Sequence, residues 1–303
     1  FRSPLIIKGA RQIGKTESIN HFAEQNYSNI VSINFVLEPK YKTILSDGYA
    51  VEDIIKNISM IDTSKKFIAG DTVIIFDELQ EFPDIATALK SFRIDGRFDV
   101  ICSGSLLGIN YRKIHSNSVG YKTDYEMFSM DFEEFLWANA EFALTREIRN
   151  HFSDFSSMGK KLHEKALSQF RLYLIIGGMP AAIMEYKKEK KLLLVPDTQQ
   201  KLLNLFLSDI TALAPKGTAR HCRNAWLSIP AQLGRTSRKF QYTRIAKGAT
   251  AKVYHEPLQW LISTGLAIPC QTAVCSKPSE TSLHLYPVDT GLCSCILKIP
   301  AFQ

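Results

Sequence analysis

The sequence predicts an α/β fold in which a parallel sheet core is followed by a helical region and a smaller domain of helices and a hairpin. Three observations support this fold class. The glycine-containing loop Gly9–Thr16 joins an apolar strand to a helix. A second apolar strand ends in the acidic pair Asp77 and Glu78. Strand and helix signals alternate to about residue 103, which is typical of a parallel sheet with helices on both faces.

Each element of the first half has its own signal. Residues 73–76 are continuously apolar, as in a strand that is covered on both faces. Residues 51–58 carry apolar side chains at helical spacing. In chain order, the expected elements are strand 4–8, helix 17–24, strand 30–35, helix 51–58, strand 73–76, helix 85–92 and strand 98–103. Ligands of such sheets bind at the carboxyl ends of the strands.

The second half is expected to be mostly helical. Asp131 followed by Glu134 predicts a capped helix start, and Gly177–Pro180 predicts a helix stop followed by a restart at proline. A helix over 225–233, a short helix over 239–245, a helix that ends at Thr264 and two strands then follow, which is the order of a winged helix. We therefore expect three domains: an α/β domain with the Gly9–Thr16 loop over 1–140, a helical lid or linker over 141–217, and a winged-helix-like domain over 218–303.

Gly9–Thr16 reads G-x-x-x-x-G-K-T, the phosphate-binding P-loop. Glycines allow the backbone to wrap a phosphate, and the N–H groups of the loop and of the following helix point at it. Lys15 is expected to reach the β- and γ-phosphates and Thr16 to hold Mg²⁺ through its hydroxyl. The alternative is a glycine turn with an exposed lysine, which the acidic pair downstream argues against.

The acidic pair and a third strand end supply further candidates. In P-loop ATPases an aspartate at the place of Asp77 supports Mg²⁺, and a glutamate at the place of Glu78 acts as the general base for water. The alternative is an ordinary acidic turn. Ser103 and Ser105 follow the 98–103 strand and are weaker candidates for the γ-phosphate or the attacking water, since Ser-Gly-Ser is also common turn chemistry.

Charge separates the two halves of the 303 residues. Residues 1–150 carry 17 lysines and arginines against 21 acidic residues (net −4), and residues 151–303 carry 20 against 9 (net +11). A basic lobe of this kind suggests a polyanionic partner, with residues 220–252 as the candidate nucleic-acid surface. A solubilising surface, or one that docks on the acidic first half, is the alternative. With no apolar run of about 18 residues, no leader and no zinc-type cysteine spacing, we expect no membrane segment and a cytoplasmic protein with reduced thiols.

Several segments together resemble bacterial and archaeal AAA-type P-loop ATPases with an uncharacterised C-terminal region. They are Gly9–Thr16, Ile75–Gln80, Ser103–Gly108, Phe132–Trp137, Gly177–Pro180, Ser228–Leu233, Lys239–Phe240 and Tyr286–Leu292. The resemblance implies an ATPase core and a winged-helix domain, with a nuclease-like fold at the far C-terminus of full-length members. This chain stops soon after Leu292, so we expect a truncated C-terminus and no nuclease activity.

The leading hypothesis is an ATPase that uses Mg²⁺, with Lys15 and Glu78 as catalytic residues and Thr16 and Asp77 on the metal. The other hypothesis is a nucleotide-gated DNA- or protein-binding switch with little turnover. A protein partner or a homo-oligomer is compatible with both, and Arg11 and Gln12 either contact nucleotide or a neighbouring subunit or face outward. The residues expected at ATP and Mg²⁺ are Gly9, Ala10, Arg11, Gln12, Ile13, Gly14, Lys15, Thr16, Asp77, Ser103 and Ser105.

Overall fold

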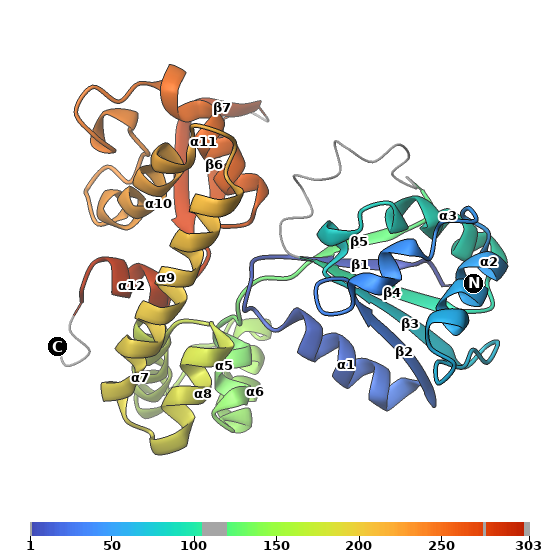
Figure 1. The fold of residues 1–303 in the computed structure, drawn as a ribbon. Coiled ribbons are helices and arrows are strands. Elements are labelled where there is room, and N and C mark those ends of the chain that lie inside the picture. The colour runs from blue at the N-terminus through green and yellow to red at the C-terminus, as the bar shows by residue number, and fades with distance from the viewer. Residues whose placement is uncertain (1, 105–119, 275–276, 300–303) are drawn as a thin grey trace. The chain divides into compact units, whose positions relative to one another are not determined.

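The computed structural model describes residues 2–104, 120–274 and 277–299, and the chain divides into two compact units, Phe1–Met127 and Phe128–Gln303 (Figure 1). The first unit holds a five-stranded sheet, and the second is mostly helical. The regions predicted as a lid, 141–217, and as a winged-helix-like domain, 218–303, both lie in the second unit. Their division into separate domains stays a prediction.

The sheet of the first unit is entirely parallel, in the order β2-β3-β4-β1-β5. The predicted α/β fold is therefore confirmed. The order places β1 between β4 and β5, so the loop after β1 emerges beside the end of β4. The strands are β1 (Leu5–Lys8), β2 (Asn29–Asn34), β3 (Thr72–Asp77), β4 (Asp99–Gly104) and β5 (Thr123–Glu126).

Helices cover both faces of this sheet, as Figure 1 shows. One core contains buried residues of α2 and α3, and the other contains buried residues of α1. In α2 the buried residues Val51, Ile54 and Ile58 lie three and four positions apart, which makes one apolar stripe. The helices are α1 (Lys15–Asn26), α2 (Val51–Ile61) and α3 (Ile85–Asp95), with short 3₁₀ turns η1 (Pro39–Thr43) and η2 (Leu79–Glu81).

Strand β3 is the centre of both cores. Ile74 and Phe76 belong to the α2–α3 side, and Val73 and Ile75 belong to the α1 side. Alternate side chains of a strand point to opposite faces, so a strand covered on both sides must be apolar at every position. This burial fixes the register of β3 and holds its last residue, Asp77, at the carboxyl edge of the sheet.

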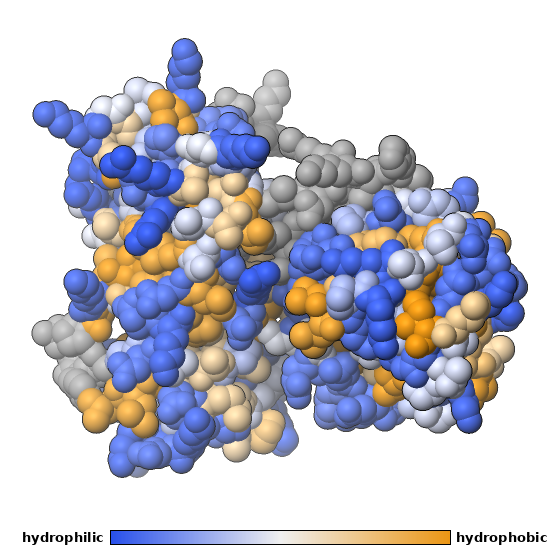
Figure 2. Space-filling view, in the orientation of Figure 1, coloured by the Kyte–Doolittle hydropathy of each residue, from blue (hydrophilic) through white to orange (hydrophobic). Residues whose placement is uncertain are grey.

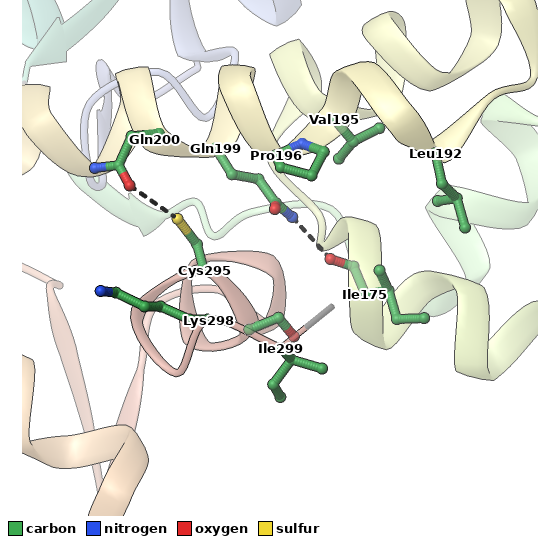
Figure 3. A pocket seen from close by; sticks show the side chains of 10 residues that line it. Ile175, Leu192, Val195, Pro196, Gln199, Gln200, Cys295, Lys298 and Ile299 are labelled. Carbon is green, nitrogen blue, oxygen red and sulfur yellow. Dashed lines mark hydrogen bonds between the residues drawn. The ribbon is translucent and has the colours of Figure 1, made fainter. Parts of the chain in front are cut away.

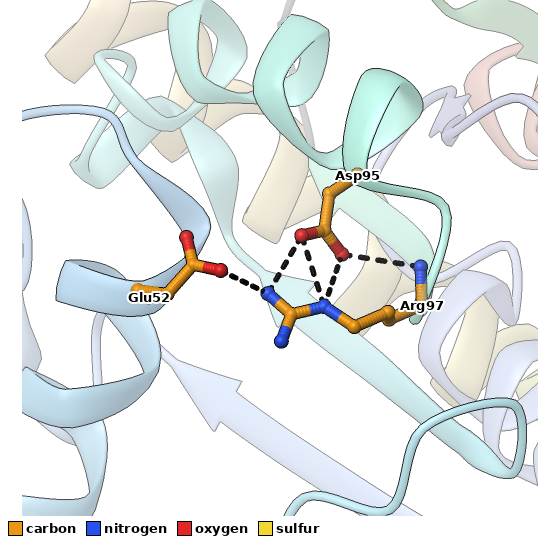
Figure 4. Close-up of polar contacts among 3 residues, drawn as sticks. All are labelled: Glu52, Asp95 and Arg97. Carbon is orange, nitrogen blue, oxygen red and sulfur yellow. Dashed lines mark hydrogen bonds and ion pairs between the residues drawn. The ribbon is translucent and has the colours of Figure 1, made fainter.

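A cluster of three charged residues ties the start of α2 to the end of α3 (Figure 4). The Arg97 guanidinium donates to Asp95 (Nε to Oδ1, 2.9 Å) and to Glu52 (Nη2 to Oε1, 2.6 Å). These bonds raise the pKa of Arg97. Because Arg97 and Glu52 are solvent-exposed, water and salt screen the cluster, and we treat it as a structural feature of small energetic weight.

The second unit begins with five helices and continues with a helical pair and a hairpin. Asp131 caps the first helix in a capping box with Glu134, as predicted, and Pro180 opens α8 at its first turn. The elements are α5 (Phe132–Ala138), α6 (Phe142–Ser153), α7 (Lys160–Ile176), α8 (Pro180–Glu189), η4 (Leu192–Leu194), α9 (Val195–Leu213), α10 (Ala219–Leu233), η5 (Tyr242–Arg244), α11 (Ala251–Ser263), β6 (Ala267–Val274), β7 (Lys277–Pro287) and α12 (Thr290–Ile296).

The elements from α10 to β7 occur in the order that the sequence predicts. A helix, a short 3₁₀ turn and a second helix precede an antiparallel hairpin in which Ala267 pairs with Pro287. Buried Trp226 of α10 donates its indole N–H to the carbonyl of Leu266 (2.9 Å), which attaches the helix to the start of the hairpin. The identification of this part as a winged helix stays a prediction.

Three glycines and a buried aspartate lock the corner between α7 and α8. The carboxylate of Asp289 accepts the backbone N–H of Gly178 (2.6 Å) and that of Leu292 (3.0 Å), which caps α12. A side chain on Gly178 would collide with the backbone of Met130, and one on Gly177 or Gly291 would collide with the facing segment. Burial raises the pKa of Asp289, while its backbone hydrogen bonds act in the opposite direction. We call Met130, Gly177, Gly178, Asp289 and Gly291 the Asp289 corner.

No single helix among the described residues is long and apolar enough to cross a membrane. The pair α7 and α8 reaches the required length and composition only when both helices are taken together, and they are bent by 120° at the break between them.

Candidate functional site

The loop Gly9–Thr16 connects β1 to α1 and contains three residues with a positive φ angle. Gly9 has φ 154°, Gln12 has φ 64° and Gly14, which precedes α1, has φ 95°. A side chain on Gly9 would overlap the carbonyl of Met127 and the tip of Ile13. Ile13 itself is buried and anchors the loop. The glycines are therefore required by the path of the loop, and its middle is held in place by one apolar side chain.

Lys15 lies folded along this loop. Its Nζ donates to the carbonyl oxygens of Gly9 (3.0 Å) and Ala10 (2.6 Å). Burial lowers the pKa of Lys15 from 10.5 to about 8, the Glu78 and Asp77 carboxylates act in the opposite direction, and the Arg11 guanidinium adds to the lowering. The ammonium is thus held inside the loop, within the electrostatic range of the acidic pair.

The side-chain carboxylate of Asp77 is a common acceptor of hydrogen bonds in the site. Its buried carboxylate accepts hydrogen bonds from the Thr16 hydroxyl (3.2 Å), the Asn34 amide (2.9 Å), the Ser103 hydroxyl and the backbone N–H of Glu78 (3.0 Å). These groups come from α1, β2, β4 and the turn after β3. The parallel register sets Asn34 opposite Asp77, so three adjacent strand ends and the first turn of α1 converge on one carboxylate.

The donor set at this point fits a magnesium ion. Mg²⁺ prefers oxygen ligands and is commonly held by one or two protein groups, with phosphates and water filling the other positions. The Thr16 hydroxyl and the Asp77 carboxylate are oxygen donors already within 3.2 Å of each other. Among the described residues, no group of three histidine, cysteine or acidic side chains is placed to hold a metal alone. A site that Mg²⁺ and phosphate complete together does not require such a group.

Glu78 follows Asp77 in the left-handed conformation, with φ 58° and ψ 48°. Its side chain is half-buried, and its Oε2 accepts a hydrogen bond from the side-chain amide of Gln80. A non-glycine residue at positive φ is uncommon, and such residues concentrate at functional sites.

The structure brings together most of the residues that the sequence predicts. Thr16, Asp77 and Ser103 share one hydrogen-bonded cluster, and Glu78 adjoins it. Lys15 bonds to the loop carbonyls and interacts with Asp77 and Glu78 electrostatically. Ser105 lies outside the described residues. Within the loop, Ala10 and Ile13 are buried, Arg11 is half-buried and Gln12 is exposed. The sequence reasoning missed Asn34, whose only signal is a polar residue at the end of an apolar strand.

The second unit contains a separate pocket of about 230 Å³ between α7, α9 and α12 (Figure 3). The Gln199 amide faces α7 and donates to the carbonyl of Ile175 (2.7 Å). The Cys295 thiol lies 3.9 Å from the amide oxygen of Gln200. Among the described residues that line it, Lys298 is the charged group, and none is acidic.

Known proteins resemble the first unit in sequence pattern and in fold. Residues 1–136 match the family model described as AAA domain. The Walker-type ATPase of Pyrococcus abyssi is similar over 98% of this chain and 91% of its own, with a TM-score of 0.59 at 11% identity. The fold is that of a P-loop NTPase. No curated protein sequence matches the chain.

The remaining comparisons describe the second unit and more distant likenesses. Residues 167–303 match a domain of unknown function, so the winged-helix and nuclease-like regions implied by the resemblance stay predictions. The Aeropyrum pernix ORC1 protein in complex with DNA covers 99% of this chain and 87% of its own at 11% identity, with a TM-score of 0.33. The Thermotoga maritima RuvB branch migration motor covers 94% and 84% at 12% identity, also with a TM-score of 0.33. Scores this low do not bear on function.

Proposed function

We propose that this chain binds ATP with Mg²⁺ in the Gly9–Thr16 loop and hydrolyses the terminal phosphate. The observation that carries the proposal is the convergence on Asp77. A loop threonine, two neighbouring strand ends and the Glu78 backbone all donate to one buried carboxylate. Phosphoryl transfer depends mainly on positioning and on stabilisation of charge, and this arrangement supplies rigid groups for both.

Each group has one task in this proposal. The loop N–H groups and the Lys15 ammonium hold the phosphates and neutralise their charge. Thr16 and Asp77 hold Mg²⁺, which stabilises the negative charge on the phosphate oxygens when it is bound. Glu78 accepts a proton from the water that attacks the γ-phosphorus, and ADP leaves as the bond to its β-phosphate oxygen breaks. Ser103 donates to Asp77 and holds the orientation of its carboxylate.

The test is a direct assay of the purified chain. Calorimetry measures ATP binding with Mg²⁺ and with a chelator, and phosphate release measures turnover with and without duplex DNA. Binding that depends on Mg²⁺, together with turnover, supports the proposal. Binding without turnover in either condition would replace it by the nucleotide-gated switch. No binding at all would overturn both.

A second candidate function concerns the basic surface between α10 and α11. Among its cationic side chains, Arg235 and Arg244 line a groove of about 430 Å³ beside α10. Figure 1 labels α10 and α11 in the second unit, and Figure 2 shows the same region with many hydrophilic side chains on its surface. We propose that this surface contacts a nucleic-acid backbone. The exposed cations are Arg235, Arg238, Lys239, Arg244, Lys247 and Lys252.

Phe240 stands among these cations in the sequence, but its side chain does not belong to the exposed surface. It is only 9% exposed and packs edge-on against Tyr242. Its backbone N–H donates to the carbonyl of Leu283 in β7 (2.8 Å). Phe240 is therefore a core residue that attaches the loop to the hairpin. The proposed contact therefore rests on the exposed cations and not on Phe240.

Replacing both Arg238 and Lys239 by alanine should weaken binding to duplex DNA about equally for different sequences, because phosphate contacts carry little base information. The slope of log affinity against log salt should become shallower by about 2, or about 1 for each lost phosphate contact. Fluorescence anisotropy at two salt concentrations measures both quantities. The matched control replaces Lys187 and Lys188, which are exposed on α8, and should leave the slope unchanged. If the wild type fails to bind even at low salt, the basic surface has another role.

A further inference from the structure

The turn after β3 holds Glu78 on a fixed backbone. Leu79 is completely buried in the α2–α3 core, and it anchors the turn between Glu78 and Gln80. The N–H of Glu81 donates to the carbonyl of Glu78 (2.9 Å), and that of Phe82 donates to the carbonyl of Leu79 (3.1 Å). The backbone therefore fixes the direction of the Cα–Cβ bond of Glu78, and the position of its carboxylate depends only on the side-chain torsion angles.

One side chain constrains those torsions. The Gln80 amide nitrogen donates to Oε2 of Glu78, a contact between two half-buried side chains two residues apart. A hydrogen bond to a carboxylate belongs to the stronger, charge-assisted class. The contact with Gln80 engages Oε2 alone and leaves the other oxygen, Oε1, out of this hydrogen bond. One carboxylate oxygen is thus occupied and the other is left available.

The other half of the Gln80 amide argues that this contact is not there for stability. Its Oε1 is buried and has no hydrogen-bond partner among the described residues. A buried acceptor without a partner is destabilising, and an apolar side chain of similar length would avoid that cost. The presence of a glutamine at position 80 is explained if its N–H group is needed to hold the Glu78 carboxylate.

We propose that Gln80 is a positioning residue for Glu78. By binding one carboxylate oxygen, Gln80 directs the other oxygen toward the attacking water. In the same way, a third group commonly orients the base that activates a nucleophile. The inference rests on the proposed function, since it assigns Glu78 the role of general base. A base displaced by about 1 Å loses on the order of 10² in rate, so the loss of this hydrogen bond should be visible in turnover.

The decisive variant is Gln80→Met, which keeps the length and removes both polar atoms. It should lower kcat by about 10–10²-fold and leave KM for ATP within about 2-fold, because Gln80 acts on the base and does not contact nucleotide. Thermal unfolding should show a protein at least as stable as the wild type, since the unpaired acceptor is gone. Glu81→Ala is the matched control: it removes an exposed residue of the same turn, whose partner is Lys42 (3.1 Å), and should change neither quantity.

A double-mutant cycle separates positioning from a general structural effect. If Gln80 works through Glu78, Gln80→Met should add no further loss in a Glu78→Gln background. Losses that multiply would overturn the proposal. Should the methionine variant fail to fold, Gln80→Glu serves the same purpose, because it keeps the shape and replaces the donor by a second carboxylate.

Failure of this inference is distinct from failure of the proposed function. Full kcat in folded Gln80→Met, alongside a wild type that hydrolyses ATP and a Glu78→Gln variant that does not, rejects the role of Gln80 alone. A wild type without turnover, or a Glu78→Gln variant with normal turnover, rejects the assignment on which the inference rests.

Discussion

Replacing Glu78 with glutamine is expected to leave ATP and Mg²⁺ bound and to slow hydrolysis by about 10²–10⁴-fold. Glutamine keeps the size and polarity of the side chain but cannot accept the proton of the attacking water. Its carbonyl oxygen can still accept the hydrogen bond from the Gln80 amide that Glu78 accepts. The variant therefore tests the base itself and leaves its surroundings in place.

Two measurements check this expectation. Calorimetry should give an ATP affinity close to that of the wild type, and single-turnover phosphate release should give the reduced rate. Glu81→Gln, the same chemical change at an exposed position three residues along, should behave as wild type in both. Normal turnover by Glu78→Gln would show that another group acts as the general base.

Replacing Lys15 with alanine should weaken ATP binding by about 10–10²-fold, the range expected for loss of a hydrogen bond between charged groups. In the structure the Lys15 ammonium donates to two loop carbonyls, so phosphate oxygens have to replace these acceptors when nucleotide binds. The fold should persist, because the side chain bonds to the loop and takes no part in the apolar cores. Calorimetry with circular dichroism measures both.

The lowered pKa of Lys15 adds a pH signature to this experiment. Lys15 loses its charge above about pH 8 in the nucleotide-free protein, so wild-type affinity should decline as pH rises through that value and Lys15→Ala should lack the decline. Stability should move the opposite way: between about pH 8 and 10.5 the unfolded chain binds the proton that the folded chain has released, so the contribution of Lys15 rises with pH. Lys56→Ala, on the exposed side of α2, is the charge-matched control. Equal affinities of Lys15→Ala and the wild type would refute phosphate contact.

The first unit was largely predictable because its signals are local. A short, continuous apolar run before the acidic pair predicted a strand covered on both faces, and β3 is that strand. The motif residues Lys15, Thr16 and Asp77 likewise depend on short stretches of sequence. Strand β5 was missed because its four residues are all exposed, and only pairing with β1 makes them a strand.

The parts that could not be predicted depend on contacts between distant residues. Asn34 reaches Asp77 across 43 positions through the register of β2 and β3, which the sequence does not state. The contact between Gln80 and Glu78 is close in sequence, yet it requires the left-handed turn at Glu78, which carries no glycine signal. The burial of Phe240 is another example, because cations surround it in the sequence whereas its backbone is bonded to the hairpin in the fold.

The Asp289 corner also determines the order in which the chain can fold during synthesis. Gly178 emerges from the ribosome 111 residues before the carboxylate that accepts its N–H. At ordinary translation speeds that interval is roughly 5–20 s. The sheet of the first unit is complete once β5 has been made, so it can close while the α7–α8 corner still lacks its acceptor. The Gly9–Thr16 loop can therefore be assembled first, whereas the second unit can complete its packing only after Asp289 and α12 have been released.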